Sequence, residues 1–182
     1  MKKVKYGILL AFSLLLSACS LLETTTPVVE GGHLKEQVKD ADLYGLWAAS
    51  SMDDDPMEFL LVKVMFPGNK GLDWLYINDT KAKEETEGVQ HFTWKVDSKA
   101  KTYTQTITER TVRETGKKEL KEKPNVVETG PLEIIQIDDE IVAVKLVGDN
   151  RQIPYIRMDE EMLRDFITDK AVADYILANM KK

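Results

Sequence analysis

Apolar and polar residues alternate along two long stretches of the chain, the spacing expected of β-strands with one buried face. In residues 89–97, Phe92 and Trp94 share one face, while a histidine, a threonine and a lysine share the other. In residues 101–112, four threonines two positions apart lie opposite Tyr103. Successive side chains of a strand point to opposite faces, so each stretch predicts a strand with one packed and one solvated face.

Eight strands are predicted in all, separated by short clusters of aspartate, glycine, proline and asparagine. Such clusters form tight turns, and the shortest of them predict antiparallel hairpins. Long helical segments do not alternate with the strands, which argues against a parallel α/β sheet. The predicted strands cover residues 45–51, 57–66, 72–78, 89–97, 101–112, 131–137, 141–147 and 151–158.

The strand predicted at residues 57–66 is apolar on both faces apart from a glutamate and Lys63, so its second face needs a cover. Residues 159–182 supply one, because their apolar residues recur at helical spacing. Asp159 is the expected N-cap of this helix. The spacing breaks at Thr168, which allows a second helix capped there. The apolar stripe is expected to pack on the sheet, with docking of a partner protein as the alternative.

The segment at residues 19–42 links the N-terminus to the first predicted strand. Its first part contains a proline and two glycines and has no periodic pattern, so it is predicted to be a flexible tether. Residues 33–42 carry Leu34 and Val38 at helical spacing and predict a short helix. The folded domain is expected to cover residues 43–182.

Residues 1–18 have the three-part pattern of a secretory signal peptide. Three lysines precede an apolar run of about 11 residues, and small residues follow it. This run is short for a permanent transmembrane helix, which needs about 20 residues. The sequence "LSAC" at residues 16–19 resembles the lipobox of bacterial lipoproteins. The resemblance implies that cleavage leaves Cys19 as the first residue and that its sulfur carries diacylglycerol.

The lipoprotein resemblance also implies a location. Many Gram-negative species acylate the new amine as well, which gives the two or three chains that stable anchoring requires. Ser20, directly after Cys19, is similar to the signal for sorting to the outer membrane in such a host. The expected location is therefore the bacterial cell envelope, with the domain facing the periplasm from the inner leaflet of the outer membrane.

The charge balance argues against nucleic acid as a partner. The formal net charge of the full chain is −6, and loss of residues 1–18 leaves 22 basic against 31 acidic residues, a charge of −9. Such a domain is repelled by phosphate-rich surfaces. Cys19 is the only cysteine, so a lipidated mature chain has no thiol left for a disulfide.

Eight antiparallel strands followed by a helix predict a β-barrel or a β-sandwich. Gly45 and Trp47, at the start of the first strand, are similar to the G-x-W signature of lipocalins. Arg157 ends the last predicted strand, where that family has an arginine over the tryptophan. The resemblance implies a closed eight-stranded barrel with Arg157 stacked on Trp47. The long loop expected at residues 113–130 departs from the compact hairpins of lipocalins, so another barrel or a sandwich stays open.

The chain shows no recognisable catalytic or metal-binding pattern. His33 lies at the end of the tether, and His91 is on the polar face of a predicted strand. The acidic turns at residues 53–55 and 138–140 lack the spacing of a calcium-binding loop. The sequence therefore predicts no catalytic residue, no cofactor and no metal.

Four aromatic residues leave the function open between two hypotheses. Trp74, Tyr76, Trp94 and Tyr103 either fill the core or line a ligand cavity, since eight-stranded barrels do both. The expected function is that of a non-catalytic interaction or accessory module in the periplasm, with an envelope protein as partner. The alternative is a lipocalin-like binder of a small apolar ligand or lipid.

Overall fold

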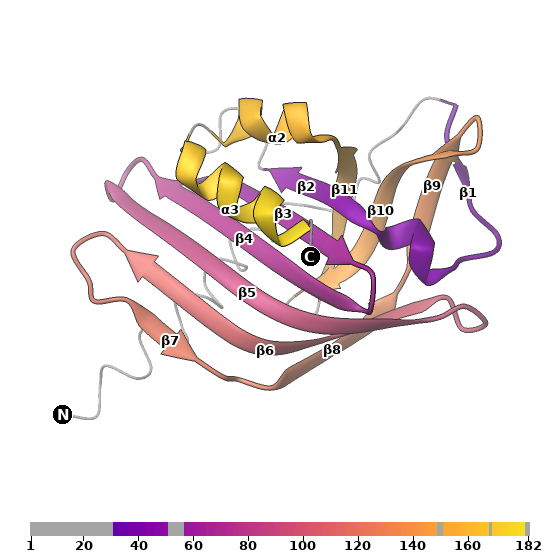
Figure 1. Ribbon diagram of the computed structural model, residues 1–182, viewed down its shortest axis with the longest axis horizontal. Helices are drawn as coiled ribbons and strands as arrows, with labels where there is room; N and C mark the ends of the chain where they lie inside the picture. Colours follow the sequence, from indigo (N-terminus) through magenta and orange to yellow (C-terminus); the bar gives the residue numbers. More distant parts are fainter. Residues whose placement is uncertain (1–30, 51–56, 149–150, 168, 181–182) are drawn as a thin grey trace.

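The computed structural model describes residues 31–50, 57–148, 151–167 and 169–180. Within them the chain is mainly β and forms a curled antiparallel sheet with a short helical segment at its C-terminal end (Figure 1). The eight predicted strands are all present, which confirms the mainly β fold class. The strands are β1 (His33–Leu34), β2 (Gly45–Ser50), β3 (Met57–Phe66), β4 (Lys70–Asp79), β5 (Glu84–Asp97), β6 (Thr102–Glu114), β7 (Leu120–Glu122), β8 (Val126–Pro131), β9 (Glu133–Ile137), β10 (Glu140–Gly148) and β11 (Arg151–Met158).

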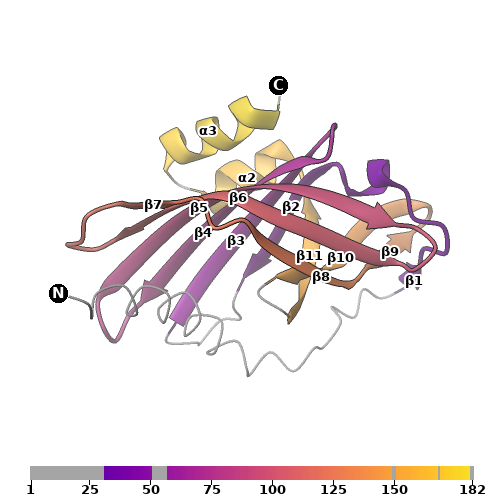
Figure 2. The ribbon, with the colours of Figure 1, turned by 90° about the horizontal axis from the view of Figure 1, so that it is seen from below.

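The strands follow the order β1-β9-β10-β11-β2-β3-β4-β5-β6-β7, and β8 pairs with β6 beside β7. Neighbouring strands along this path are antiparallel. The strands from β3 to β6 are the longest, and β5 runs for 14 residues. Long, twisted antiparallel strands curl a sheet, and here the curl produces a half-barrel (Figure 2).

The sheet is not the closed eight-stranded barrel that the lipocalin resemblance implies. Among the described residues, no ladder joins β8 to β9 or β10. The chain passes from β8 to β9 through Leu132 alone, and β9 turns away from the line of β8 (Figure 1). The two sides meet there through close contacts. Gln152 Nε2 donates to the Pro131 carbonyl at 2.7 Å, and a Cβ on Gly130 would lie 2.9 Å from that of Val147. Strands that cross at a corner cannot share a ladder, so the curl stays open.

Two predictions about irregular segments are wrong. The loop expected at residues 113–130 contains β7 and β8, which both pair with β6. The helix expected at residues 33–42 is absent, because β1 pairs with β9 and only a 3₁₀-helix, η2 (Asp40–Leu43), follows. Val38 is buried among the interior residues, so this segment belongs to the folded domain rather than to the tether.

The C-terminal segment forms two helices on one side of the sheet (Figure 2). They are α2 (Glu160–Phe166) and α3 (Lys170–Met180). Asp159 caps α2 as predicted, and its side chain accepts a hydrogen bond from the Met162 amide at 2.7 Å. Asp169 accepts from the Ala171 amide at 2.8 Å at the start of α3. Thr168, the predicted second cap, lies outside the described residues, as do the predicted signal peptide and lipobox. Of the described helices, none has the length and apolar character needed to cross a membrane.

The sheet separates two apolar clusters. Large side chains fill the interior of the curl, and Trp47, Tyr103 and Tyr155 each expose at most 1% of their surface. On the outer face, Val64 of β3 and Leu163 of α2 belong to one buried cluster. The helices therefore supply the cover that the apolar pattern of β3 predicts.

Candidate functional site

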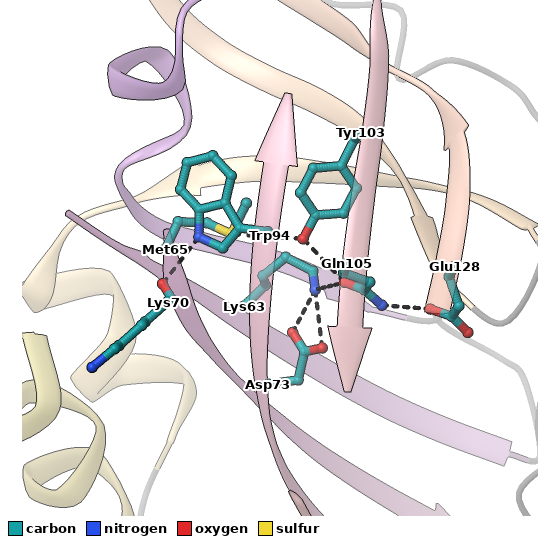
Figure 3. Close-up of polar contacts among 8 residues, drawn as sticks. All are labelled: Lys63, Met65, Lys70, Asp73, Trp94, Tyr103, Gln105 and Glu128. Atoms are coloured by element: carbon teal, nitrogen blue, oxygen red, sulfur yellow. Dashed lines mark hydrogen bonds and ion pairs between the residues drawn. The ribbon is translucent and has the colours of Figure 1, made fainter. Parts of the chain in front are cut away.

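A buried polar cluster crosses the interior of the half-barrel (Figure 3). Lys63 Nζ lies 2.8 and 2.9 Å from the two carboxylate oxygens of Asp73, and it donates to Gln105 Oε1 at 3.0 Å. Gln105 Nε2 donates in turn to Glu128. The four residues come from β3, β4, β6 and β8, so their contacts pass over β5 and link the middle of the sheet to the edge at β8.

The register of the strands assembles this cluster. Lys63 and Asp73 are direct partners across β3 and β4, and Gln105 shares the inward face of β6 with Tyr103. Lys63 exposes only 1% of its surface, and its ammonium group also lies 4.2 Å from the centroid of the Phe92 ring. A buried charge is tolerated where it is paired and hydrogen-bonded, as this ammonium group is.

The carboxylates of Asp73 and Glu128 both lie in this cluster with the ammonium group of Lys63. Burial raises the pKa of Asp73, and the charge of Glu128 adds to the rise, while Lys63 opposes it. Burial also raises the pKa values of Tyr103 and Tyr155 well above that of a free tyrosine, with a further contribution from Asp73. The Tyr103 hydroxyl donates to Gln105 Oε1 at 3.0 Å, which joins it to the cluster. This connected set of buried polar groups fits a role in holding the curl together.

The three residues of the lipocalin-like pattern meet beside this interior. Arg157 and Trp47 are partners across β11 and β2, and Arg157 Cζ lies 4.6 Å from the centroid of the Trp47 ring. The contact predicted between them is therefore present. Gly45 has a φ of +126°, which strains other residues, and a Cβ there would lie 2.7 Å from Arg157 Nη2 and displace the guanidinium group from this position. Trp47 Nε1 donates to the Leu43 carbonyl at 2.8 Å, which fixes the ring.

A groove opens on the outer face of the sheet, between the ends of the long strands and the junction of α2 with α3. Its volume is about 520 Å³, within the range of about 300–1,000 Å³ typical of ligand pockets. Trp74 and Tyr76 of β4 contribute a stacked pair of rings, with planes 6° apart and centroids 6.1 Å apart. Leu60, Ile167 and Val172 add apolar surface from β3 and the helical segment. The groove thus combines an aromatic surface with aliphatic neighbours.

Charged side chains surround the aromatic pair. The lining carries four carboxylates, from Glu85, Glu87, Glu114 and Asp169. Arg113 is the basic residue of the described lining, and its Nη1 lies 3.6 Å from Glu87 Oε2. Trp74 Nε1 donates to Glu87 Oε1 at 2.8 Å. Burial raises the pKa of Tyr76, and the adjacent, hydrogen-bonded Glu85 carboxylate raises it further. Both rings therefore carry a carboxylate at their polar edge.

The four aromatic residues that the sequence leaves open between filling the core and lining a ligand cavity do not lie together. Trp74 and Tyr76 face the outer groove, whereas Trp94 and Tyr103 lie in the interior with their centroids 6.4 Å apart. The two pairs sit on opposite faces because Asp73 takes the inward position of β4 and the next residue must point outward. The four residues therefore do not line one shared cavity, and the burial of Trp74, Trp94 and Tyr103 in the two apolar clusters favours the core-filling alternative.

The remaining sequence-based candidates lie apart from both places. His33 is in β1, and His91 is on the outer face of β5, with Nε2 3.5 Å from the Tyr175 hydroxyl of α3. Cys19, the predicted lipidation site, lies outside the described residues. Within the described ranges, no group of three or more histidine, cysteine, aspartate or glutamate side chains is arranged to hold a metal ion.

The sequence interpretation missed the interior cluster, although it contained one signal for it. Lys63 stands out as a charge in an otherwise apolar strand, and Gln105 occupies an inward position of the alternating stretch in β6. Their meeting depends on the register between strands, which alternation along one strand does not specify.

Comparisons of the chain with protein-family models, with curated proteins and with solved structures found no match. A function for this chain is therefore inferred from its own residues and their geometry.

Proposed function

We propose that the protein is a membrane-anchored, non-catalytic lipoprotein of the bacterial cell envelope whose folded domain acts as an interaction module in the periplasm. The observation that carries the proposal is the contrast between the two faces of the sheet. Inside the curl, Trp47, Tyr103 and Tyr155 are buried and the ammonium group of Lys63 is bonded to its neighbours. Outside, the groove that contains Trp74 is accessible, so a partner meets the domain at that face.

The anchor is proposed from the sequence. The lipobox-like "LSAC" motif ends at Cys19, and the 13 residues at 20–32 extend to roughly 40 Å when unfolded. That reach holds a domain clear of the lipid headgroups. The charge of −9 that remains without residues 1–18 opposes binding to an anionic membrane surface. A tethered domain of this kind is free to turn its groove toward another envelope protein.

Site-specific photo-crosslinking in intact cells tests the interaction. A photoreactive amino acid replaces Glu85, which is exposed at the groove, and in a matched control replaces Glu140, which is exposed at the start of β10. A discrete protein adduct is expected from position 85 and not from position 140. Equal adducts from both positions, or none from either, would contradict an interaction through this face.

The anchor is tested separately through Cys19→Ala. The substitution should abolish metabolic labelling with a radioactive fatty acid and leave the precursor uncleaved, because the acylated sulfur is the substrate for processing. Cys19→Ser provides the matched control, since it keeps the size of the side chain and also lacks the sulfur. Persistent labelling of either variant would remove the lipoprotein proposal.

A second candidate function is that of a lipocalin-like binder of a small apolar ligand or lipid. The packing of Arg157 on Trp47 beside Gly45, in a curled antiparallel sheet, favours it. Native mass spectrometry of the mature chain should then show a bound small molecule that is lost after extraction with organic solvent. A mass equal to that of the bare chain under the gentlest conditions would count against this candidate.

A further inference from the structure

We infer that the groove binds a basic segment of a partner protein, with a lysine or arginine side chain seated against the Trp74–Tyr76 pair. The inference rests on the proposed interaction function and adds the surface and the chemistry of the partner.

The charges of the groove favour a cation. The described lining contains four carboxylates and one guanidinium group. Arg113 is already engaged, because its Nε lies 2.6 Å from Glu119 Oε2 and its Nη1 lies 3.6 Å from Glu87 Oε2. Lys117 pairs with Glu114 at the edge of the groove. An incoming positive charge therefore meets an excess of negative charge, whereas an incoming carboxylate would be repelled.

The aromatic pair also attracts cations. Cations are drawn to the faces of tryptophan and tyrosine rings when they lie within about 6 Å of the centroid. Here the Trp74 indole donates to Glu87, and the Tyr76 hydroxyl is bonded to Glu85. Trp74 exposes only 6% of its surface, whereas Tyr76 is partly exposed and stacks on it. A cation in the groove therefore lies over the accessible part of the Tyr76 ring and near two carboxylates at once, which a neutral side chain cannot exploit.

The shape of the groove favours a protein segment over a free small cation. Its edge is open, since Arg113 exposes 65% of its side chain and Glu85 is exposed. A small-ligand site usually encloses about 70–90% of its ligand, and this groove covers a ligand from one side. Leu60 and Val172 offer apolar surface to the methylene stem of a basic side chain and to a flanking apolar residue. The backbone of the partner segment on either side of its basic residue then continues along the surface of the domain.

Nuclear magnetic resonance of the indole groups tests the inference directly. The chain has three tryptophans, and each indole N–H has a defined partner. Only Trp74 lies in the groove, while Trp47 and Trp94 donate to backbone carbonyls and act as internal controls. The ¹⁵N-labelled full chain in detergent micelles is titrated with acetylated, amidated Ala-Leu-Lys-Leu-Ala and with its arginine, norleucine and glutamate analogues. The lysine and arginine peptides should shift the Trp74 signal alone, and the other two peptides should not.

Variants of the groove sharpen the test. Glu85→Gln combined with Glu87→Gln removes two charges but keeps an acceptor for each ring, and it should weaken binding of the lysine peptide about fivefold. The matched control, Glu109→Gln with Glu140→Gln, removes two exposed charges outside the groove and should leave binding unchanged. Tyr76→Phe should keep most of the affinity and Tyr76→Leu should lose it, because the ring face is the attracting element.

Several outcomes would overturn the inference. Equal binding of the norleucine peptide would show that charge is not recognised. Binding of free lysine amide as tight as that of the peptide would identify a small cation rather than a segment. If no basic peptide moves the Trp74 signal while the photo-adduct at position 85 forms in cells, the basic partner is wrong and the interaction function stands. If the peptides bind and no adduct forms, the groove chemistry stands and the envelope interaction fails.

Discussion

Replacing Lys63 with methionine tests whether paired charges hold the interior of the half-barrel together. The ammonium group is 1% exposed and contacts both oxygens of Asp73, so water cannot replace it in the folded chain. Removing one partner of a buried ion pair costs about 3–5 kcal/mol, because the other charge stays buried without compensation. The free energy of unfolding, about 5–15 kcal/mol for a typical domain, would fall by a large fraction.

The loss should depend on pH in a defined direction. The folded-state pKa of Asp73 is already raised by burial, and Lys63 is the group that opposes the rise. In Lys63→Met the pKa of Asp73 rises further, so near neutral pH the folded variant bears the whole free-energy cost of a buried, unpaired carboxylate. As the pH falls through the folded pKa, the carboxyl group takes up a proton and this cost disappears. The difference in stability between the variant and the natural chain should therefore shrink as the pH is lowered from 7 toward the ordinary aspartate pKa, about 3.9.

A double variant separates charge balance from packing. Lys63→Met with Asp73→Leu replaces the ion pair by apolar side chains, an exchange that is often neutral or stabilising by about 1–4 kcal/mol. It should recover most of the stability that the single variant loses. Urea unfolding followed by tryptophan fluorescence measures the natural chain, both single variants and the double variant, with the slope checked for two-state behaviour. A loss below about 1 kcal/mol in Lys63→Met, against the 3–5 expected for a buried pair, or a double variant as unstable as the sum of its single changes, would refute the reasoning.

Three further predictions concern other parts of the fold. Gly45→Ala should lower the free energy of unfolding in urea by about 1–3 kcal/mol. The loss should exceed that of Gly68→Ala, because both glycines have positive φ but, of these two, only a Cβ on Gly45 meets a guanidinium group. Equal losses in the two variants would contradict the close packing at Gly45. Tyr103 and Tyr155 should ionise only as the chain unfolds, because burial raises their pKa values in the folded state. The stability linked to this rise is fully present below about pH 10, the pKa of a free tyrosine, and is lost as the pH increases above it. Reversible ionisation of all six tyrosines in ultraviolet absorbance, with a circular dichroism spectrum that stays unchanged, would contradict this prediction. Asp159→Ala should cost about 1 kcal/mol and speed amide exchange in the first turn of α2, where the Met162 amide loses its acceptor; unchanged exchange there would show that the cap adds nothing.

The strands that the sequence predicted share a property that the missed strands lack. In β5 and β6, side chains such as Phe92, Trp94 and Tyr103 recur at every second position over many residues, so the pattern is recognisable without knowing the partners. The missed strands lack such an alternating run, and β8, with six residues, ends in a glycine and a proline, which are typical of turns. β7 has three residues, two of them charged, and β1 has two. Such segments become strands only because β6 and β9 present free edges to them, which is a property of the assembled sheet.

By itself, the sequence determined local structure and composition. The strand periodicity, the cap at Asp159 and the acidic charge each follow from neighbouring residues or from composition. The contact of Trp47 with Arg157 was implied by the resemblance to lipocalins. Only the tertiary structure decided that the sheet stays an open curl, that Lys63 pairs with Asp73 in the interior, and that Trp74 lines a groove on the outer face. These outcomes depend on register and on contacts between distant segments, and a shift of one residue would reverse every face.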